Sequence, residues 1–461
     1  MKKHSIKKSK SKYADGAVQR PRMSQMQVIS LGFFLIIMSG TLLLGLPISS
    51  RSGEATPFLD CLFTATSATC VTGLVTVDTY SHWSVFGQCV ILLMIQIGGL
   101  GFMTIATFFF LLMNKKLGLR EREILSESIN SLQIGGILKL AKRIIAVTAV
   151  MELTGALLLM IRFCPRFGFL KGMYMGIFHS VSAFCNAGFD LLGQIEEYCS
   201  IVPYYNDILV NLVIMLLIII GGLGFLVWDD VLNHGIHIKK YRLQSKIVLL
   251  MTTILVFGGA ALLFITEKDA ACAGMNIGER ILTAFFGSVT ARTAGFNSID
   301  VAKLSSGGKL TTIMLMFIGG SPGSTAGGIK TTTFITLMLY AFSYIRRERT
   351  FGIFGRRLES SALRKAVAVF FTNLTMILTV TLAITAIDGL PLADILFETT
   401  SAVGTVGLTT GVTRELSRVS QMLLVFLMYC GRVGSLSFAG ALAEKKAPPP
   451  IMNPVERITI G

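Results

Sequence analysis

Four short segments of this chain share one pattern of residue types, and each ends at a glycine. Each begins with Phe, continues with small and hydroxyl-bearing residues, reaches Gly ten positions after the Phe, and then has Leu or Phe. Such a run can present backbone carbonyl oxygens to a cation in place of its water shell, because glycine allows the required backbone angles and a close approach of chains. A plainer interpretation is that these glycines only let helices pack closely, but four copies in register favour the cation path. The segments are Phe63–Leu74 (FTATSATCVTGL), Phe178–Phe189 (FHSVSAFCNAGF), Phe285–Phe296 (FFGSVTARTAGF) and Phe397–Leu408 (FETTSAVGTVGL).

The length of these segments predicts how they are held. A helix needs about 20 apolar residues to cross a bilayer, so each segment is expected to be a re-entrant half-helix. Non-helical backbone survives at membrane depth only where it is buried in protein or lines a water-filled cavity. The partly negative C-terminal ends of four half-helices would favour a cation at a common axis. The sequence therefore predicts a central pore lined by rings of carbonyl groups.

A second glycine cluster follows each of the four segments at about the length of one membrane span. Each quarter of the chain thus consists of a long apolar segment, a short segment ending in Gly, and a second long apolar segment. The clusters are IGGLG at Ile97–Gly101, IGGLG at Ile220–Gly224, IGGSPG at Ile318–Gly323 and CGRVG at Cys430–Gly434.

The composition places these elements in a membrane. The chain has 461 residues, of which 52% are hydrophobic and 15% charged, whereas soluble domains carry about 25% charged residues. This excludes a string of ordinary soluble domains. We expect an all-α polytopic membrane protein with four tandem span–pore half-helix–span repeats around a central pore, giving eight spans and four re-entrant loops. The expected spans are Val28–Ile48, Val85–Met113, Ile144–Ile161, Ile208–Trp228, Ile247–Thr266, an interrupted span from Thr311 to Tyr344, Ala366–Ile387 and Gln421–Ala443.

The net charge of +16 predicts orientation rather than binding to nucleic acid. Lys and Arg gather in Lys115–Arg143, His234–Lys246 and Arg346–Lys365, and are scarce in Asp190–Asp207. Because cytoplasmic loops carry the positive excess, both termini are expected in the cytoplasm. The basic N-terminal arm is too long and polar for a signal peptide and suits contact with anionic lipid. The predicted divisions are the arm 1–22, pore repeat 1 at 23–113, a cytoplasmic loop and repeat 2 at 114–232, repeat 3 at 233–345, a cytoplasmic loop and repeat 4 at 346–443, and a cytoplasmic tail 444–461.

The second apolar segment of the third quarter is interrupted, whereas those of the other three quarters are continuous. Residues 319–330 read GGSPGSTAGGIK, with five glycines and a proline in the middle of a span. Proline removes a backbone donor and clashes with the preceding turn, so helix cannot run smoothly through this stretch. Its freed backbone must face protein or water. A permanently kinked helix is the alternative.

Arg432 stands where the other quarters have Gly99, Gly222 and Gly320. Arginine inside a span is costly and faces a bundle interior or an aqueous cavity. Beside a cation path it would oppose passage of the ion and could donate to carbonyls of the 319–330 loop. The alternative is an ion pair with a structural acid.

Several further side chains have both a functional and a structural interpretation. Glu398 is expected to be a structural partner for a basic group such as Arg292, and His179 to be a packing residue rather than a metal ligand. Glu152 fits either a packing contact or a sodium site, and Asp190 and Asn297 either an outer mouth that attracts cations or ordinary loop polarity. The eight cysteines show no metal or disulfide spacing and are expected to be free thiols, with Cys164 and Cys199 as the one conceivable pair.

Taken together, TSATCVTGL, SAFCNAGF, TARTAGF, TSAVGTVGL, GGSPGSTAGGIKTTT and CGRVGS resemble the Trk/Ktr/HKT superfamily of potassium transporters, and most of all its bacterial KtrB membrane subunits. The resemblance covers the chain after the basic arm. It implies a selectivity filter whose backbone carbonyls bind K⁺, and Gly73, where sodium-preferring plant members often have Ser, implies potassium selectivity. The filter residues would be Cys70, Val71, Thr72, Gly73, Cys185, Asn186, Ala187, Gly188, Arg292, Thr293, Ala294, Gly295, Gly404, Thr405, Val406 and Gly407.

The same resemblance implies a gate and partners. The gate would be the intramembrane loop 319–330, which interrupts the second span of repeat 3, together with Arg432. Its individual gate residues would be Arg432, Gly319, Gly320, Ser321, Pro322, Gly323, Ser324, Thr325, Ala326, Gly327 and Gly328. The family implies a homodimer in the bacterial plasma membrane that pairs with a cytoplasmic RCK-type ring binding ATP or ADP, transports K⁺ without a bound cofactor, and uses Na⁺ as an activating or coupled ion. A sodium-permeable transporter of the same fold is the alternative function. A membrane enzyme is a remote one, because no acid, base and nucleophile fall together in a motif.

Overall fold

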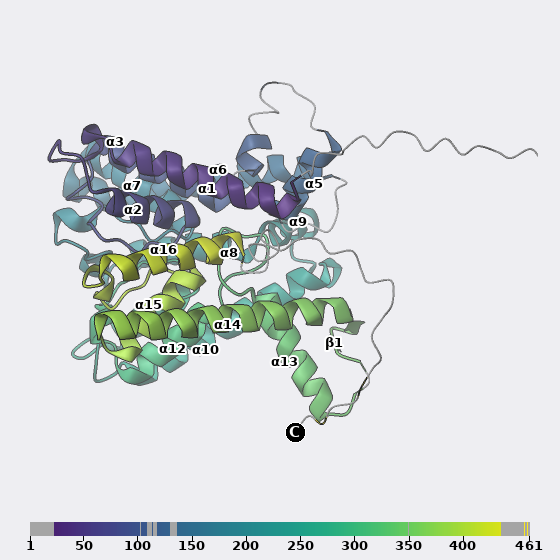
Figure 1. Cartoon of the computed structure of the whole chain (residues 1–461). Coiled ribbons are helices and arrows are strands. Elements are labelled where there is room, and N and C mark those ends of the chain that lie inside the picture. Colours follow the sequence, from purple (N-terminus) through teal and green to yellow (C-terminus); the bar gives the residue numbers. More distant parts are fainter. Residues whose placement is uncertain are drawn as a thin grey trace, which may run out of the picture.

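The computed structural model describes residues 23–101, 103–107, 113, 118–129, 136–348, 350–434, 456 and 459. Helices make up nearly all of the regular structure (Figure 1). The predicted N-terminal arm and almost all of the predicted C-terminal tail lie outside the described residues. The longer helices are α1 (Gln25–Leu44), α2 (Phe58–Cys70), α3 (Val85–Leu100), α5 (Leu119–Ser128), α6 (Ile137–Phe167), α7 (Phe169–Phe184), α8 (Ile208–Leu223), α9 (Phe225–His234), α10 (Leu243–Thr266), α11 (Ile277–Thr290), α12 (Ser306–Phe317), α13 (Thr331–Ile345), α14 (Ser360–Asp388), α15 (Leu392–Gly404) and α16 (Arg418–Val433).

Short elements connect these helices at their ends. A two-stranded antiparallel hairpin, β1 (Gly352–Ile353) and β2 (Arg356–Arg357), joins α13 to α14. Six 3₁₀ turns lie in the described connections: η1 (Pro47–Ser49), η2 (Leu192–Gln194), η3 (Val202–Tyr204), η4 (Ile238–Lys240), η5 (Val301–Lys303) and η6 (Val412–Arg414).

Four described helices are long and apolar enough to cross a membrane: α1, α6, α10 and α14, with 20, 31, 24 and 29 residues. Each opens one quarter of the chain and agrees with one of the expected spans. Serine and glutamine at the start of α1 form a reciprocal cap, in which the Ser24 hydroxyl accepts from the Gln27 amide and the Gln27 side chain accepts from the Ser24 amide. The multi-pass helical membrane fold is therefore confirmed, while the count of eight spans stays a prediction.

In the first, second and fourth quarters, the second apolar segment differs from the continuous span that the sequence predicts. Helix α3 ends at Leu100 and α8 at Leu223, where the chain bends by 96° into α9. The following residues, Gly101 and Gly224, have φ of +80° and +100°, which a right-handed helix cannot contain. Helix α16 likewise ends before Gly434, with φ +94°. The predicted spans Val85–Met113 and Ile208–Trp228 are thus broken helices. The ends of Val85–Met113 in the first quarter and of Gln421–Ala443 in the fourth fall partly outside the described residues.

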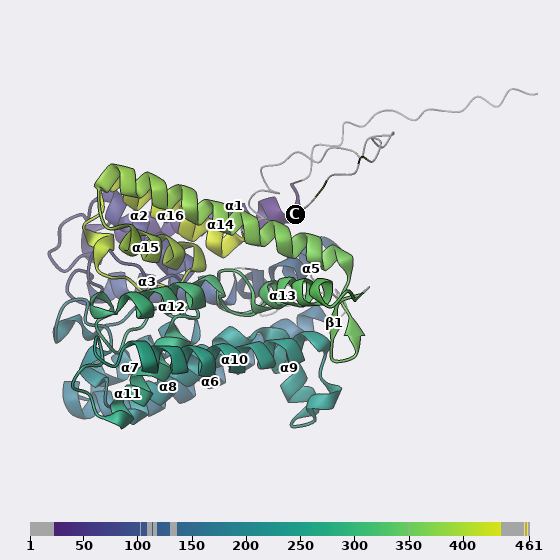
Figure 2. The ribbon, with the colours of Figure 1, turned by 90° about the horizontal axis from the view of Figure 1, so that it is seen from below.

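The short helices α2, α7, α11 and α15 lie within the bundle rather than across it. Helix α2 packs on α1, α3 and α16, and α7 on α6, α8 and α3. Helix α11 packs on α10 and α8, and α15 on α14, α16 and α12. Figure 2 shows α15 and α16 beneath α14, with α7, α8 and α11 on the opposite side of the molecule. Contacts between successive quarters therefore run through these short helices.

Buried aromatic side chains anchor three of the four short helices as the common Phe predicts. Phe63, Phe178 and Phe397 are fully buried. In α11 the equivalent Phe285 is only partly buried and packs edge-on against Phe257 of α10 at 5.4 Å, while its neighbour Phe286 is fully buried. Helix α11 also ends five residues before its glycine, whereas α2 ends three before. The third segment therefore differs from its sisters in the burial of its common Phe and in where its helix ends.

Candidate functional site: a ring of four glycines

The four segment glycines lie against one another in a closed ring. A Cβ atom added to Gly73 would lie 2.5 Å from the Ala187 carbonyl oxygen, and one added to Gly188 would lie 2.7 Å from that of Ala294. One added to Gly295 would lie 2.5 Å from the Val406 carbonyl oxygen. Gly407 completes the circle, because its Cβ would overlap the carbonyl oxygen of Thr72. Each glycine thus meets the residue before the next glycine, in sequence order around the ring.

The backbone of each segment takes two left-handed conformations near this ring. The glycine has a positive φ, and so does the residue two positions before it. The values are +56° and +100° at Val71 and Gly73, +59° and +71° at Asn186 and Gly188, +91° and +84° at Thr293 and Gly295, and +49° and +92° at Thr405 and Gly407. Positive φ is rare for a β-branched residue and marks backbone held by its surroundings at ligand sites. All four second positions are among the predicted filter residues, but their left-handed conformation was not predicted, since Val and Thr carry no signal for it and only Asn186 favours it.

Hydroxyl groups of the half-helices hold the ring segments in place. The Ser67 Oγ accepts from the Gly73 amide at 3.0 Å, and the Ser401 Oγ accepts from the Gly407 amide at 3.0 Å. In the other two segments the hydroxyl donates instead, from Ser182 to the Phe189 carbonyl at 2.7 Å and from Thr290 to the Phe296 carbonyl at 2.6 Å. The hydroxyl residues of the repeated pattern therefore fix the backbone on either side of the glycine and leave the carbonyls before it free of these bonds.

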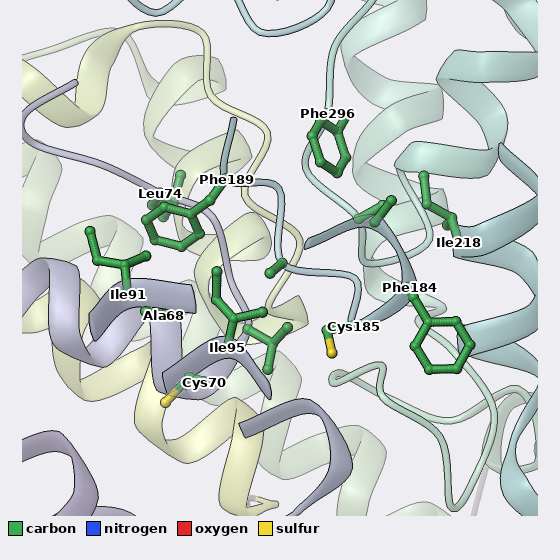
Figure 3. Close-up of a cluster of buried hydrophobic side chains, with 14 of the residues drawn as sticks. Ala68, Cys70, Leu74, Ile91, Ile95, Phe184, Cys185, Phe189, Ile218 and Phe296 are labelled. Carbon is green, nitrogen blue, oxygen red and sulfur yellow. The ribbon is translucent and has the colours of Figure 1, made fainter. Parts of the chain in front are cut away.

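Apolar side chains fix the ring from outside. The residues that follow the glycines, Leu74, Phe189, Phe296 and Leu408, are all buried. Figure 3 shows three of them in one buried cluster with Cys70 at the end of α2 and Cys185 just after α7. The ring is thus embedded in a packed core, and its backbone cannot move without disturbing that core.

A cavity that is open to solvent and encloses about 830 Å³ reaches the ring on the side of the loops that follow the four glycines. All four glycines line it, together with three carboxylates and the guanidinium of Arg414. Asp78, which sequence reasoning missed, accepts hydrogen bonds from the amides of Tyr80 and Tyr198 at 2.9 and 3.1 Å. It therefore ties the outer loop of the first quarter to that of the second. The other carboxylates are Asp190 and Asp300, and Asn297 also lines the cavity.

We expect cation uptake to depend on external pH through the carboxyl group of Asp190. It lies in the loop after α7 and accepts from the Leu192 amide at 2.9 Å. Burial, with a smaller contribution from the charge of Asp78, raises its pKa to about 7. A carboxyl group with a raised pKa is charged above that value and neutral below it, so cation uptake is expected to fall as external pH drops from about 8 to about 6. Uptake measured across this range in wild type and Asp190→Asn checks it: the variant should give the low rate at both ends, and an unchanged profile would remove Asp190 from the pH response.

The interrupted stretch of the third quarter forms an irregular loop beneath the ring. Helix α12 ends at Phe317 and α13 begins at Thr331. The added Cβ of Gly327 would overlap the Thr405 hydroxyl, and that of Gly328 would lie 3.1 Å from the Gly404 carbonyl oxygen. The loop therefore touches the residues just before the ring in the fourth quarter. This is an irregular intramembrane loop and not the kinked helix that we considered as an alternative.

The break between α8 and α9 holds the other side of this loop. The amides of Ser321 and Thr325 donate to the carbonyls of Gly222 and Gly221 at 3.1 and 3.3 Å. In return, the Phe225 amide donates to the Gly323 carbonyl at 2.6 Å. The loop thus satisfies backbone groups that the 96° bend leaves without helical partners.

Arg432 joins the loop to the first quarter. Its guanidinium donates to the Thr325 carbonyl of the loop and to the carbonyls of Gly98 and Gly99 at the end of α3. Among the described residues it forms no ion pair with an acid, so the alternative of a structural salt bridge is wrong for this part of the chain. A second cavity, with an empty volume of about 1370 Å³, lies beyond the loop and is lined by Pro322, Ser324, Lys330 and Arg432 among others. The loop and Arg432 therefore lie between the ring and this second cavity.

Some of the singled-out side chains do not make the predicted contacts. Glu398 accepts from the hydroxyls of Thr409 and Thr413, while Arg292 donates to the Thr252 hydroxyl at 3.4 Å. The expected pair between them is wrong, because each is turned into its own half of the bundle and Glu398 stabilises the loop that follows its own ring segment.

The other buried polar groups that the sequence analysis singled out have hydrogen-bond partners nearby. His179 contacts the Met175 carbonyl at 2.8 Å and accepts from the Leu191 amide at 3.3 Å, so it is a packing residue. Glu152 accepts from the Gln96 side chain at 3.2 Å and lies 3.9 Å from the Cys185 sulfur. Within the described residues no group of three potential metal ligands occurs. The eight cysteines, all in described positions, are free thiols, including Cys164 and Cys199.

Comparison with known proteins identifies the family to which this chain belongs. The model of the TrkH family, described as cation transport protein, matches residues 5–448. The chain belongs to this family, and it is a cation transporter rather than an enzyme. The solved potassium transporter TrkH from Vibrio parahaemolyticus has the same fold, with a TM-score of 0.71 at 17% identity over 92% of this chain and 86% of that one. The resemblance inferred from the sequence is thereby confirmed.

Three individual relatives show which members of the family this chain is similar to. The chain is 41% identical to the potassium/sodium uptake protein NtpJ of Enterococcus hirae, over 96% of this chain and 98% of that one. It is 40% identical to the Ktr system potassium uptake protein B of Bacillus subtilis, over 93% and 95%. The protein of the same description from Vibrio alginolyticus is 34% identical, over 97% of both chains. Each of these relatives is similar to this chain over more than nine-tenths of its length.

Proposed function

We propose that this chain is the potassium-translocating subunit of a Ktr-type uptake system in the bacterial plasma membrane. The closed ring of four glycines is the observation that carries the proposal. The carbonyls of Thr72, Ala187, Ala294 and Val406 each lie against the glycine of a neighbouring segment. Carbonyl groups in this arrangement can replace the water shell of a dehydrated cation. The names of the relatives, which describe potassium uptake, support K⁺ as that cation.

The path of the ion follows from the two cavities. A cation is drawn into the outer cavity by Asp78, Asp190 and Asp300. It loses water at the ring, where the negative ends of α2, α7, α11 and α15 are directed. The filter consists of four residues from each segment: Cys70–Gly73, Cys185–Gly188, Arg292–Gly295 and Gly404–Gly407. Because these four triplets before the glycine differ in sequence, the ion sites along the filter are not equivalent.

The gate lies on the inner side of the filter. It comprises residues 319–328 and Arg432, whose guanidinium holds the loop by the Thr325 carbonyl. While these bonds persist, the ion cannot reach the inner cavity. The chain works as a homodimer with both termini in the cytoplasm, where its basic loops receive an RCK-type ring. Binding of ATP or ADP to that ring shifts the gate, and Na⁺ acts as an activating or coupled ion.

A sodium-permeable transporter is the second candidate, favoured by the name of the Enterococcus hirae relative, a potassium/sodium uptake protein. Uptake into cells that lack their own potassium transporters separates the two. We expect the chain to restore growth at low potassium, to take up K⁺ in preference to Na⁺, and to do so faster with an RCK subunit. Equal K⁺ and Na⁺ uptake would favour the second candidate. No uptake of either ion, from protein shown to be in the membrane, would reject the proposed function.

A further inference from the structure

Two positively charged side chains meet on one tyrosine in the loop between α2 and α3. The guanidinium carbon of Arg51 lies 4.0 Å from the centre of the Tyr80 ring. The ammonium of Lys171 lies 5.0 Å from the same centre and donates to the Tyr80 hydroxyl at 2.7 Å. Both distances to the ring are in the range of cation–π interactions. Two like charges that are far apart in the sequence are thus held close together by a single side chain.

No acidic side chain in the described part of the chain forms an ion pair with either cation. The carboxylate of Asp78 accepts instead from the backbone amides of Tyr80 and Ser81, at 2.9 and 2.7 Å. Burial alone would raise the pKa of the Tyr80 phenol, but the hydrogen bonds and charges of Lys171 and Arg51 lower that pKa below its usual value. Tyr80 therefore lies in an excess of positive charge.

Both cations are held in place and still have donors for an anion. The Arg51 Nε donates to the Trp83 carbonyl at 3.3 Å, and the Arg51 amide donates to the His82 carbonyl at 2.9 Å. An arginine has five N–H donors and a lysine has three, so these contacts leave several donors available. The side chains of Arg51 and Lys171 are both exposed. A guanidinium fork beside an ammonium group suits the oxygen atoms of a phosphodiester.

The two cations lie at the ends of two membrane-spanning helices. Helix α1 ends at Leu44 and α6 at Phe167, and Arg51 and Lys171 follow a few residues later. The basic loop 115–143 precedes α6, so the cations lie at the end of this helix that is opposite to that loop. Figure 1 shows α2, α3 and α7 beside α1 and α6. This position corresponds to the edge of the hydrocarbon layer, where lipid phosphates lie.

Exposed apolar side chains lie close to both cations in the sequence. Ile48 is 63% exposed, and Phe169 and Leu170 are 68% and 74% exposed. Apolar side chains at the end of a spanning helix can pack against acyl chains, which removes them from water. A phospholipid can therefore use the cations and the apolar residues together. A free phosphate ion would use the cations alone, so the arrangement favours a lipid as the ligand.

We propose that Arg51, Lys171 and Tyr80 form a binding site for the phosphate of an anionic phospholipid of the phosphatidylglycerol class. The headgroup lies in the leaflet opposite the basic loops, and this placement alone rests on the orientation given under the proposed function. A zwitterionic headgroup binds less well, because its own ammonium group meets two cations. Since Asp78 holds the Tyr80 amide and also lines the cavity that reaches the ring, a bound lipid stabilises the loop that carries Asp78.

Native mass spectrometry of the delipidated full-length protein tests the site. The protein is titrated with phosphatidylglycerol or phosphatidylethanolamine, and the dissociation constant of the first bound lipid is measured. The double variant Arg51→Gln, Lys171→Gln removes both charges. We expect its dissociation constant for phosphatidylglycerol to rise roughly tenfold or more, since each basic group near a lipid phosphate contributes to binding. Its affinity for phosphatidylethanolamine should change little, and Lys171→Arg, which keeps the charge, should bind phosphatidylglycerol as wild type does.

Arg162→Gln is the matched control for net charge. Arg162 lies near the same end of α6 and is also exposed, but it already has an acidic partner, because its Nε pairs with Asp207 at 3.0 Å. The substitution removes a positive charge from the same end of the molecule and leaves Arg51 and Lys171 in place. The affinity of this variant for phosphatidylglycerol should therefore remain near that of wild type.

Four results would overturn the lipid site. Unchanged affinity for phosphatidylglycerol in the double variant would do so, as would an equal loss of affinity in Arg162→Gln, which would mean that only net charge matters. Equal affinity of wild type for the two lipids would reject the anionic headgroup. Displacement of phosphatidylglycerol from wild type by inorganic phosphate would assign the cations to a free anion instead.

A single variant keeps the test decisive if the double variant fails to fold. Lys171→Gln changes one exposed side chain and should weaken binding of phosphatidylglycerol several-fold, whereas wild-type affinity in it would reject the site. Lipid binding is measured without transport. Absence of K⁺ uptake would therefore reject the proposed function, while the lipid titration would still decide the role of Arg51, Lys171 and Tyr80.

Discussion

Gly407→Ser is expected to abolish most K⁺ uptake and to reduce the preference for K⁺ over Na⁺. Any Cβ at this position overlaps the carbonyl oxygen of Thr72 and lies 2.9 Å from the Cα of Gly73. Either the fourth segment must withdraw from the ring or the Thr72 carbonyl must turn away. In addition, φ of +92° costs a residue with a side chain on the order of 1–3 kcal/mol. Since about 1.4 kcal/mol is a tenfold change, we expect uptake to fall by roughly tenfold or more in transport-deficient cells.

Gly389→Ser is the control for backbone strain. Gly389 follows α14, has φ of +66°, and has no heavy atom within 4 Å of an added Cβ. It therefore carries a similar conformational cost without crowding, and its uptake should remain near that of wild type. If Gly407→Ser transported as fast and as selectively as wild type, the assignment of the ring as a filter would be wrong.

Replacing Arg432 with alanine is expected to increase K⁺ flux through a less tightly closed pore. The substitution removes bonds to three carbonyls, those of Thr325, Gly98 and Gly99. It also removes a positive charge that lines the inner cavity. Hydrogen bonds to charged groups contribute about 1.5–3 kcal/mol each, so the loss of even one corresponds to roughly a tenfold shift toward the open loop. Flux in cells that lack any regulatory subunit measures this directly.

Arg432→Lys tests whether the positive charge of Arg432 or its hydrogen bonds to the carbonyls limit the flux. Lysine keeps the charge but lacks the planar fork that reaches carbonyls on two sides, so we expect flux between those of wild type and Arg432→Ala. If uptake and its regulation in Arg432→Ala matched wild type, Arg432 would have no part in gating. A flux lower than wild type, with normal amounts of protein in the membrane, would assign it to the stability of the bundle instead.

The repeated pattern in the sequence was sufficient to predict the class of fold and the position of the glycines. Four Phe-to-Gly segments identify the short helices because each is too short to cross a bilayer. The loop at 319–330 was also predictable, since five glycines and Pro322 cannot form regular helix. Both predictions depend on local rules that a single sequence displays.

The features that the sequence did not predict depend on contacts between different quarters of the chain. The breaks at Gly101 and Gly224 were missed because IGGLG reads as part of an apolar span, and a bend of 96° is set by the loop that packs on it. The Glu398–Arg292 pair was wrong because opposite charges in one sequence carry no information on which way each side chain turns.

The ring closes within one polypeptide, and this has a consequence for how its parts can differ. In a ring of four identical chains, every substitution appears four times, so a blocking loop or an inner cation would have to fit fourfold symmetry. Here the third quarter alone carries the loop and the fourth alone carries Arg432, while the α8–α9 bend of the second quarter receives the loop. A single loop, residues 319–330, therefore lies next to the ring, instead of four equivalent loops that meet at its axis. In the proposed pore, displacing this one segment is enough to open the path of the ion, and one partner docked on one side is enough to displace it.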